Sequence, residues 1–344
     1  MALLRALLLL WPVLVAGPLP PAPASAAGQP APLQISGSST VTPLIEQAIR
    51  TYERQQPERR GRVQVRTNGS STGLRSLCSG QNALVMASRP INRQELQRCS
   101  KSGVTFIELP IAFDAITVVV NPRNSWARQI STRELQRLWD RQAQTRISRW
   151  NQVNLDWPAQ PIRLCGPGRD SGTYDTFNQV INGASGNSRS DYQASEDDAV
   201  LVQCVAKDPL ALGYFGFSYF KANQQRLRAL AVIGPKGAVA PSTATVQEER
   251  YVPLSRPLFL YVNDARLRRD RHLRDFLTFT VQRGRRLSEQ ANMVPLPADT
   301  YRLVETKLYR HVLGSAFGGD QPGGMSLKQA LSRSLDRIKR PQFQ

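Results

Sequence analysis

Short apolar runs alternate with amphipathic stretches along the chain from residue 33 onward. Runs rich in β-branched residues and bounded by Gly, Pro, Asn or Asp are typical of strands, and apolar residues that recur every three or four positions are typical of helices. This pattern predicts strands at residues 33–35, 63–65, 83–86, 104–109, 115–120, 162–165, 212–215, 230–233 and 257–262. It predicts helices at residues 43–54, 72–78, 93–99, 132–141, 173–181, 199–206, 272–283 and 285–292.

The alternation of strands and helices predicts an α/β fold, in which helices cover sheets of mainly parallel strands. No segment of about 20–50 residues repeats, which argues against a solenoid. After Gly314 the composition changes, because Gly and Pro are frequent from 318 to 324 and a short basic amphipathic stretch covers 327–338. The sequence leaves open whether this stretch, within a basic C-terminal tail of residues 316–344, is a surface helix or a disordered segment.

The first 26 residues have the features of a secretory signal peptide. One basic residue, Arg5, precedes an apolar segment from Leu7 to Val15, which is shorter than the roughly 20 residues that a membrane-spanning helix needs. Ala24-Ser25-Ala26 fits the small-residue pattern of a cleavage site. We therefore expect cleavage near Ala26 and export to the periplasm, with an uncleaved membrane anchor as the alternative.

The four cysteines are Cys78, Cys99, Cys165 and Cys204, and they contain no Cys-x-x-Cys pair and no neighbouring His. This spacing argues against a metal site. Four cysteines allow three pairings, of which Cys78–Cys99 with Cys165–Cys204 keeps each bridge within one region of sequence. We expect these two disulfides in an oxidising compartment, and four buried thiols are the alternative.

The 344-residue chain carries 45 Lys and Arg against 26 Asp and Glu, a formal net charge of +19, and 41% of its residues are hydrophobic. The apolar content excludes a wholly disordered chain, and the length is sufficient for two domains. The charge indicates an anionic partner. The sequence has only two histidines, His272 and His311, so a zinc centre or a Ser-His-Asp triad is hard to build. We expect no catalytic residue, no metal and no cofactor.

A cluster of Gly, Ser and Thr stands between a predicted strand and a predicted helix at three places. The clusters are Gly37-Ser38-Ser39-Thr40, Asn68-Gly69-Ser70-Ser71-Thr72-Gly73 and Gly166-Pro167-Gly168-Arg169-Asp170-Ser171-Gly172-Thr173. A helix start offers free backbone N–H groups, the positive end of the helix dipole and hydroxyl donors, so three converging starts would surround a tetrahedral oxyanion. Three ordinary N-caps are the alternative interpretation. None of the clusters has the spacing of a Walker A or G-x-G-x-x-G loop, so a nucleotide site is not indicated.

These clusters resemble the PstS and SphX type of phosphate-binding protein, the exported receptor of a phosphate ABC transporter. Further matching segments are Ala87-Ser88-Arg89-Pro90-Ile91, Ser195-Glu196-Asp197-Asp198, Leu212-Gly213-Tyr214-Phe215-Gly216 and Pro253-Leu254-Ser255-Arg256-Pro257-Leu258. The resemblance covers residues 33–315 and implies a two-lobed periplasmic-binding-protein fold of type II with a ligand cleft between the lobes. Lobe one would comprise residues 33–120 plus 250–315, and lobe two residues 121–249. The implied partners are inorganic phosphate and the membrane permease of an ABC transporter. We expect a monomer without nucleic acid as its main partner.

The resemblance implies phosphate ligands at all three helix starts: Ser39, Thr40 and Val41 in the first, Ser70 in the second, and Ser171, Gly172 and Thr173 in the third. Arg169 is the expected substitute for the family's pocket arginine, which has no match at the same spacing. The best-known branch has an acid that accepts the phosphate proton, but this chain has Arg89 there, as the SphX branch does. Asp170 or Asp175 could replace that acceptor. The alternative role of Arg89 is a surface ion pair.

Two other functions are weighed against a phosphate receptor. A phosphate-ester hydrolase would need an activated nucleophile or a metal pair, but Ser39 and Ser171 have no His nearby in the sequence. A polyanion-binding envelope protein would fit the net charge, but the basic residues are scattered and RNA-binding and zinc-finger signatures are missing. The sequence therefore favours reversible capture of inorganic phosphate.

Overall fold

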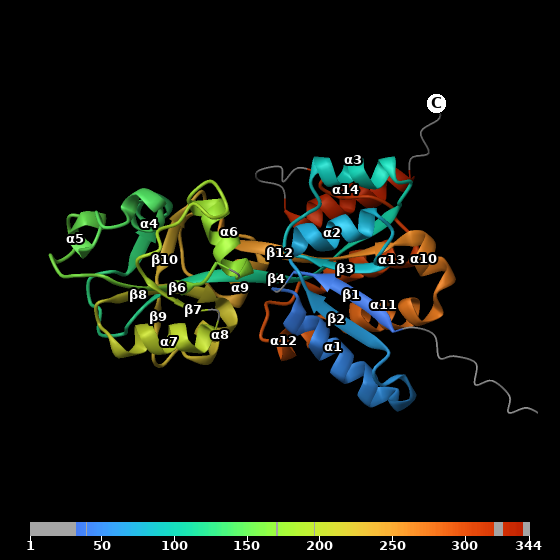
Figure 1. The fold of residues 1–344 in the computed structure, drawn as a ribbon, viewed down its shortest axis with the longest axis horizontal. Coiled ribbons are helices and arrows are strands. Elements are labelled where there is room, and N and C mark those ends of the chain that lie inside the picture. The colour runs from blue at the N-terminus through green and yellow to red at the C-terminus, as the bar shows by residue number, and fades with distance from the viewer. Residues whose placement is uncertain (1–31, 39, 170, 196, 320–325, 340–344) are drawn as a thin grey trace, which may run out of the picture. The chain divides into compact units, whose positions relative to one another are not determined.

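The computed structural model describes residues 32–319 and 326–339, except residues 39, 170 and 196 (Figure 1). The predicted signal peptide and its cleavage site lie outside the described residues, as does part of the basic tail. Within the described ranges, no helix has the length and apolar character needed to cross a membrane.

A mixed sheet lies at the centre of the described chain. Its strands are β1 (Leu33–Gly37), β2 (Val63–Thr67), β3 (Leu84–Ala87), β4 (Phe106–Val120), β6 (Arg163–Pro167), β7 (Gln193–Ser195), β8 (Ala211–Gly216), β9 (Arg228–Ala229) and β12 (Ser255–Asn263). They follow the order β2-β1-β3-β12-β4-β8-β6-β7, and β9 pairs with β4. A small second sheet contains β5 (Gln129–Ser131), β10 (Ala231–Gly234) and β11 (Gly237–Val239), in the order β11-β10-β5.

The predicted α/β class is confirmed, but the expectation of mainly parallel strands is wrong. β1 is parallel to β2 and β3, and β6 is parallel to β7 and β8. Between these two groups, β12 runs antiparallel to β3 and β4, and β4 runs antiparallel to β8. The long antiparallel pair β4–β12 therefore connects two groups of parallel strands (Figure 1).

β4 is a single strand of 15 residues and is buried almost throughout, where the sequence pattern predicted two strands at 104–109 and 115–120. Pro110 lies inside it, opposite Phe259, and the register shifts beside it because Ile111 of β4 is an extra residue opposite the step from Leu258 to Phe259. A bulge accommodates the missing N–H of a proline. The strand therefore continues through the position at which the apolar pattern ended.

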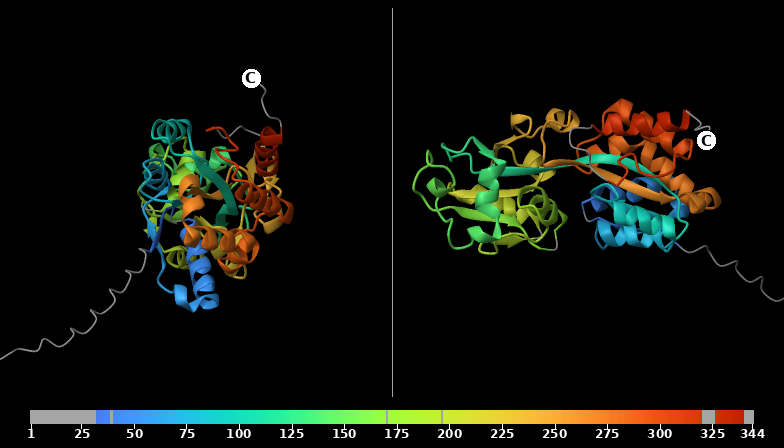
Figure 2. Two further views of the ribbon diagram at one scale, coloured as in Figure 1. Left: turned by 90° about the vertical axis from the view of Figure 1, so that its right-hand side faces the viewer. Right: turned by 90° about the horizontal axis from the view of Figure 1, so that it is seen from above.

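Helices cover both faces of the large sheet (Figures 1 and 2). The predicted helices are present as α1 (Thr42–Gln55), α2 (Ser70–Cys78), α3 (Arg93–Lys101), α4 (Thr132–Trp139), α6 (Gly172–Ile181), α7 (Asp198–Lys207), α11 (Arg271–Gln282) and α12 (Gly284–Gln290). The pattern missed α5 (Trp150–Val153), α8 (Phe217–Ala222), α9 (Thr243–Gln247), α10 (Asp264–Arg269), α13 (Ala298–Tyr309) and the short 3₁₀ turns Pro57–Arg59 and Arg141–Ala143. The basic C-terminal stretch is a helix, α14 (Leu327–Lys339), which packs on α13 and buries Leu327, Ala330 and Leu331.

Two disulfides join secondary-structure elements, and they confirm the predicted pairing. Cys78 at the end of α2 is bonded to Cys99 of α3, and Cys165 of β6 is bonded to Cys204 of α7. Loops of this size stabilise a fold by roughly 3–4 kcal/mol each in the chain-entropy model. One bridge holds the helix that follows the second hydroxyl-rich cluster, and the other holds the strand that leads into the third.

The start of α2 lies very close to the end of β1. Gly37 has a φ of +137°, and a Cβ at this position would lie 2.0 Å from the Met86 carbonyl oxygen. A Cβ on Gly73 would lie 2.9 Å from the Cα of Gly37. Both positions therefore require glycine, since only a residue without a side chain permits this approach.

We expect the substitution Gly73→Ala to lower the free energy of unfolding. Overpacking against backbone costs about 1–3 kcal/mol, which exceeds the gain of up to about 1 kcal/mol that Ala gives a helix over Gly. Urea unfolding measures the difference. Gly216→Ala is the matched control, because its Cβ would meet no atom closer than 3.6 Å; an unchanged or raised stability of Gly73→Ala would contradict this packing.

Candidate functional site

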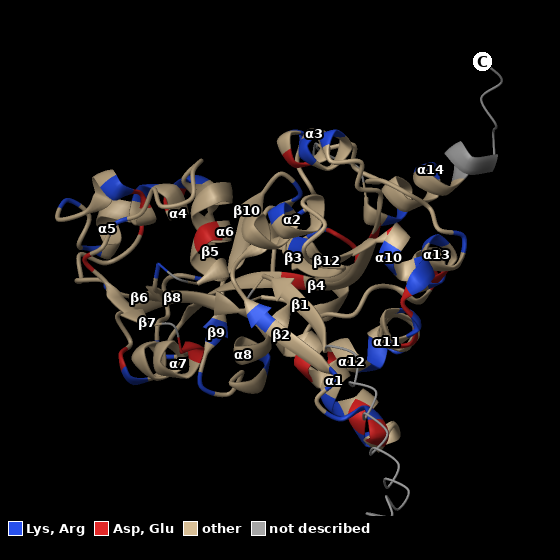
Figure 3. Ribbon diagram, turned by 45° about the vertical axis from the view of Figure 1, so that its right-hand side comes forward, with Lys and Arg blue, Asp and Glu red and all other residues tan. Residues whose placement is uncertain are grey.

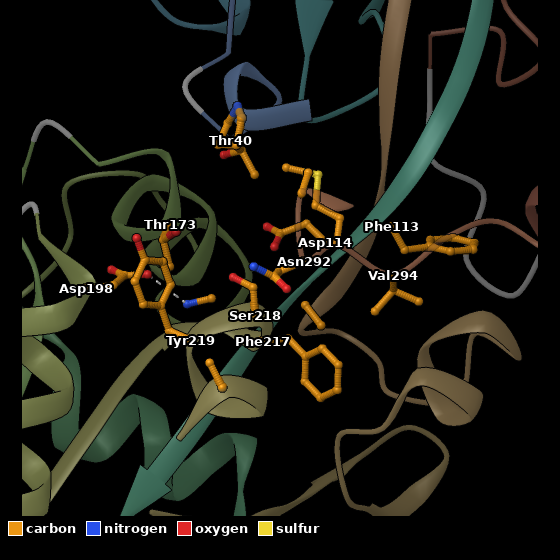
Figure 4. Close-up of a pocket in the computed structure, with 16 residues that line it drawn as sticks. Thr40, Phe113, Asp114, Thr173, Asp198, Phe217, Ser218, Tyr219, Asn292 and Val294 are labelled. Atoms are coloured by element: carbon orange, nitrogen blue, oxygen red, sulfur yellow. Dashed lines mark hydrogen bonds between the residues drawn. The ribbon is translucent and has the colours of Figure 1, made fainter. Parts of the chain in front are cut away.

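Two cavities lie beside the middle of β4 and the start of β12. The larger, of about 740 Å³, is lined by Arg89, Arg169 and Arg256 among other residues, and we call it the basic cavity. The smaller, of about 410 Å³, is lined by Asp114 and Asp198 among others and has no Lys or Arg in its described lining. We call it the acidic cavity (Figure 4).

Arg256 on β12 lies between the two cavities. Its Nη2 atom donates to Thr40 Oγ1, Asp114 Oδ2 and the Gly172 carbonyl, each at 3.4 Å. Its Nε atom is buried and has no hydrogen-bond partner among the described residues. The side chain is 14% exposed, and burial lowers the pKa of the guanidinium while Asp114 opposes that shift. Arg256 is thus a largely buried cation that has three long contacts and unused donor capacity among the described residues.

The strand register accounts for this arrangement. Arg256 and Asp114 are directly opposite each other in the β12–β4 ladder, and opposite charges in such a position stabilise a sheet by roughly 0.2–1 kcal/mol. Thr40 lies two residues before α1, next to the N-cap residue Val41, and Gly172 begins α6. The fold therefore brings the first and third hydroxyl-rich helix starts to one guanidinium group.

The predicted ligand residues divide between the two cavities. Ser70, Arg89, Arg169 and Gly172 line the basic cavity, whereas Thr40 and Thr173 line the acidic cavity. Ser39 lies outside the described residues, as does Asp170, and Val41 and Ser171 line neither of these two cavities. The three helix starts thus do not line one common cavity in this structure. Arg256 is close to all three helix starts. It contacts Thr40 of the first and Gly172 of the third, and it lines the basic cavity together with Ser70 of the second.

Several predicted donors already have partners within their own turns. Ser171 caps α6, where its Oγ accepts the N–H of Thr173 at 3.1 Å. The Oγ of Ser70 accepts the N–H of Ser88 at 3.0 Å, and the N–H of Val41 donates to a carbonyl of its own turn at 3.2 Å. A hydroxyl that accepts one bond still has its own proton to donate. Ser171 therefore keeps a donor for a ligand, whereas the amide of Val41 is occupied. The hydroxyl of Ser70 also lies 3.2 Å from that of Ser88, and either of the two can donate.

Arg89 is held by a carboxylate. Its guanidinium makes a two-pronged ion pair with Glu95, at 2.9 and 2.8 Å, and also donates to Ser71 at 2.8 Å. Glu95 is 7% exposed and completes the capping box of α3 with Asn92. The hydrogen bond to Glu95 raises the pKa of Arg89, against the opposing effect of burial. Arg89 therefore lines the basic cavity, but both Nη atoms of its guanidinium donate to Glu95.

The sequence interpretation missed Arg256 and Asp114 as site residues. The segment that contains Arg256 supported the family resemblance, and Asp114 lies between the two strands predicted at 104–109 and 115–120, but neither position follows a strand-to-helix turn. Their partnership depends on the register of two strands, in which the paired residues are 142 positions apart.

No group of three or more His, Cys, Asp or Glu side chains that could hold a metal ion occurs among the described residues. The described linings of both cavities contain neither His nor Cys. The described linings of the two cavities offer three arginines, of which Arg256 is the most buried, several hydroxyl groups and the N-terminal ends of helices.

The chain is similar to known proteins over most of its length. The family model of the PBP superfamily domain matches residues 22–283. Protein SphX of Synechocystis sp. is 39% identical over 88% of this chain and 89% of its own length. The phosphate-binding protein PstS of Staphylococcus haemolyticus is 31% identical over 79% of this chain and 84% of its own length. The crystal structure of a possible phosphate binding protein from Planctomyces limnophilus superposes with a TM-score of 0.72 at 34% identity, covering 81% of this chain and 98% of that one.

We expect Arg89→Gln to destabilise the protein by about 1–3 kcal/mol, because it leaves the largely buried Glu95 without its cation. Thermal or urea unfolding measures the loss. The double variant R89Q/E95Q should recover part of the stability, since both partners are then neutral. A stability unchanged by Arg89→Gln would show that the ion pair contributes nothing.

Proposed function

The chain belongs to the PBP superfamily and, within it, to the phosphate-binding proteins of the SphX and PstS type, and from this premise we propose that it is an exported receptor that captures inorganic phosphate. It binds phosphate reversibly, without making or breaking a covalent bond, and delivers it to the membrane permease of an ABC transporter. The observation that supports this most directly is the buried guanidinium of Arg256 between two helix starts.

Phosphate binds at Arg256, with hydroxyl donors from Thr40 and Thr173 and the N-terminal end of α6. The three contacts of Arg256, each 3.4 Å long, are weak enough to be replaced by contacts to an anion. A charge-assisted hydrogen bond contributes roughly 1.5–3 kcal/mol, whereas micromolar binding needs about −8 kcal/mol. About three to five such bonds would supply this free energy, and the cost of removing water from the anion calls for more donors than that.

The remaining predicted ligands join this site when the protein closes. Lobe one comprises residues 33–120 plus 250–315, lobe two comprises 121–249, and β4 and β12 connect them. Ser70 belongs to lobe one, and Ser171 and Gly172 belong to lobe two, so closure adds donors from two sides. Ser39 and Arg169 complete the proposed ligand set. Closure also excludes water, which strengthens each polar contact.

Asp114 selects the protonated forms of phosphate. A carboxylate beside a bound anion is tolerated when a proton lies between them, and monohydrogen phosphate carries such a proton while sulfate does not. The position that holds an acid in the best-known branch of the family is Arg89 in this chain, so it offers no acceptor for the phosphate proton. Asp114 is a candidate acceptor because it contacts the guanidinium of Arg256 directly. Asp175 instead accepts a hydrogen bond from Ser185 at the rim of the basic cavity.

Two alternatives have less support. A hydrolase would need an activated nucleophile, but His272 contacts Arg59 and His311 contacts Asp264, and neither histidine lines either cavity. A polyanion-binding surface would gather its cations on one face, whereas Lys and Arg are spread over many elements, among them α2, α3, α11 and α13 (Figure 3). The receptor acts in the periplasm as a monomer after removal of its signal peptide near Ala26.

Calorimetry with ligand-stripped protein tests the receptor function. We expect one phosphate per chain, bound with a micromolar Kd or tighter. Thr173→Val and Ser70→Ala each weaken binding by about 1–3 kcal/mol, because a buried phosphate oxygen loses a donor. Thr306→Val, on α13 and outside both linings, is the control and leaves the affinity unchanged. The absence of heat at millimolar phosphate would refute the proposal.

Asp114→Asn should change the selectivity between phosphate and sulfate. The amide of Asn donates as well as accepts, so the variant loses discrimination against an anion without a proton. We expect phosphate affinity to fall, sulfate affinity to rise, and the ratio of the two Kd values to change by about tenfold or more. Competition calorimetry measures this ratio, and an unchanged ratio would exclude Asp114 as the selecting residue.

A further inference from the structure

A buried carboxylate lies in β4 outside the linings of both cavities. Glu108 has no exposed surface. Its Oε2 atom accepts hydrogen bonds from the hydroxyls of Tyr261 at 2.9 Å and Ser315 at 2.8 Å, and its Oε1 atom accepts the N–H of Ala316 at 2.8 Å. Burial raises the pKa of Glu108, and the charge of Lys307, which is also fully buried, opposes that shift. A buried pair of opposite charges seldom stabilises a fold more than apolar residues would, so the partners of Glu108 indicate its role.

Tyr261 of β12 connects this carboxylate to the turn that follows β3. β12 lies between β3 and β4 (Figure 1), and Tyr261 is directly opposite Glu108 in the β12–β4 ladder. The buried hydroxyl of Tyr261 donates to Glu108 and accepts the N–H of Ile91 at 2.8 Å. Ile91 is fully buried and lies outside helices and strands, so its N–H depends on this hydroxyl. The strand register therefore fixes the end of the turn.

The same turn carries Ser88 and Arg89, which line the basic cavity. The N–H of Ser88 donates to the Oγ of Ser70 at 3.0 Å, and the two hydroxyls lie 3.2 Å apart. Ser70 begins α2 and is one of the proposed phosphate ligands. When the Ser88 hydroxyl donates, Ser70 accepts two hydrogen bonds and its own proton is left for a ligand. The position of the turn therefore determines where the hydroxyl of Ser70 can donate.

The segment that follows α13 holds the other end of this network. Ser315 and Ala316 supply two of the three hydrogen bonds to Glu108. Phe317 packs edge-on against Phe259 of β12, with ring centroids 5.8 Å apart. Residues 315–317 thus fix the carboxylate from the side of the chain that leads toward α14.

We propose that Tyr261 and Glu108 are positioning residues of the phosphate site, which hold the turn of residues 88–91 and, through Ser88, direct the hydroxyl of Ser70 at the ligand. Neither residue touches phosphate. This inference rests on the proposed function, because Ser70 is one of its ligands. It also gives residues 315–316 a part in phosphate binding, although they lie outside both linings.

Phosphate calorimetry on Tyr261→Phe tests the proposal, with Tyr301→Phe as the matched control. Tyr301 is also buried, and its hydroxyl likewise accepts a backbone N–H, that of Leu296 at 3.3 Å, and donates to an oxygen, the Ile111 carbonyl at 2.9 Å. We expect Tyr261→Phe to raise the phosphate Kd about three- to tenfold, the effect of one lost hydrogen bond. Tyr301→Phe keeps the wild-type Kd, although urea unfolding should show a similar loss of stability in both variants.

A double-mutant cycle with Ser70→Ala separates positioning from a general loss of stability. Because Tyr261 acts through the hydroxyl of Ser70, Tyr261→Phe adds no further loss of phosphate affinity in the Ser70→Ala background. Hydrogen exchange of the Ile91 amide should also become faster in Tyr261→Phe and not in Tyr301→Phe, since only the first substitution removes its partner. Ser315→Ala removes one donor to Glu108 at a partly exposed position and should raise the Kd about two- to threefold.

The outcomes separate this inference from the proposed function. An unchanged phosphate Kd in Tyr261→Phe overturns the inference alone, and so does an equal rise in Tyr301→Phe or a fully additive effect with Ser70→Ala. If Tyr261→Phe does not fold, Ser315→Ala decides, and an unchanged Kd in that variant overturns the inference. Failure of the wild-type protein to bind phosphate refutes the receptor function itself.

Discussion

The site depends on a guanidinium group that the fold buries without fully pairing. Removing a charged group from water is costly unless it is paired and hydrogen-bonded. Among the described residues Arg256 has three side-chain hydrogen bonds, each 3.4 Å long, and its Nε has no partner. The antiparallel pairing of β12 with β4 fixes Arg256 opposite Asp114. The starts of α1 and α6 then add dipoles that disfavour a second cation and favour an anion. An anionic ligand completes the set of partners that this cation lacks.

Local chemistry made most of the fold predictable. The helix predicted at 43–54 is observed at Thr42–Gln55, because a proline at its first positions and a regular apolar stripe define it. The helix α13 was missed because its buried face includes Thr300, Tyr301 and Lys307 beside Val304. Apolar residues therefore do not recur every three or four positions along it. The continuous strand β4 was missed because a bulge at Ile111, within β4 itself, accommodates Pro110. Tertiary packing decided both cases.

The candidate site was predictable in part. The three hydroxyl-rich helix starts could be recognised because strand, loop and helix follow one another in sequence, and Ser70, Gly172 and Thr173 do line the two cavities. The cation could not be located in the same way. Arg89 and Arg169 were expected from the family resemblance, whereas Arg256 reaches Thr40 only because β12 returns beside β4 late in the chain. Pairing between distant strands leaves little local trace in a single sequence.

A crystal structure of the protein with bound phosphate tests the central claim most directly. The account predicts phosphate oxygens at ordinary hydrogen-bond distances, about 2.7–3.2 Å, from the guanidinium of Arg256 and from the hydroxyls of Thr40 and Thr173. It also predicts that Asp114 lies within hydrogen-bond distance of a phosphate oxygen. The account would be contradicted if Arg89 and Arg169 held the phosphate instead, while Arg256 kept its contacts to Asp114, Thr40 and Gly172.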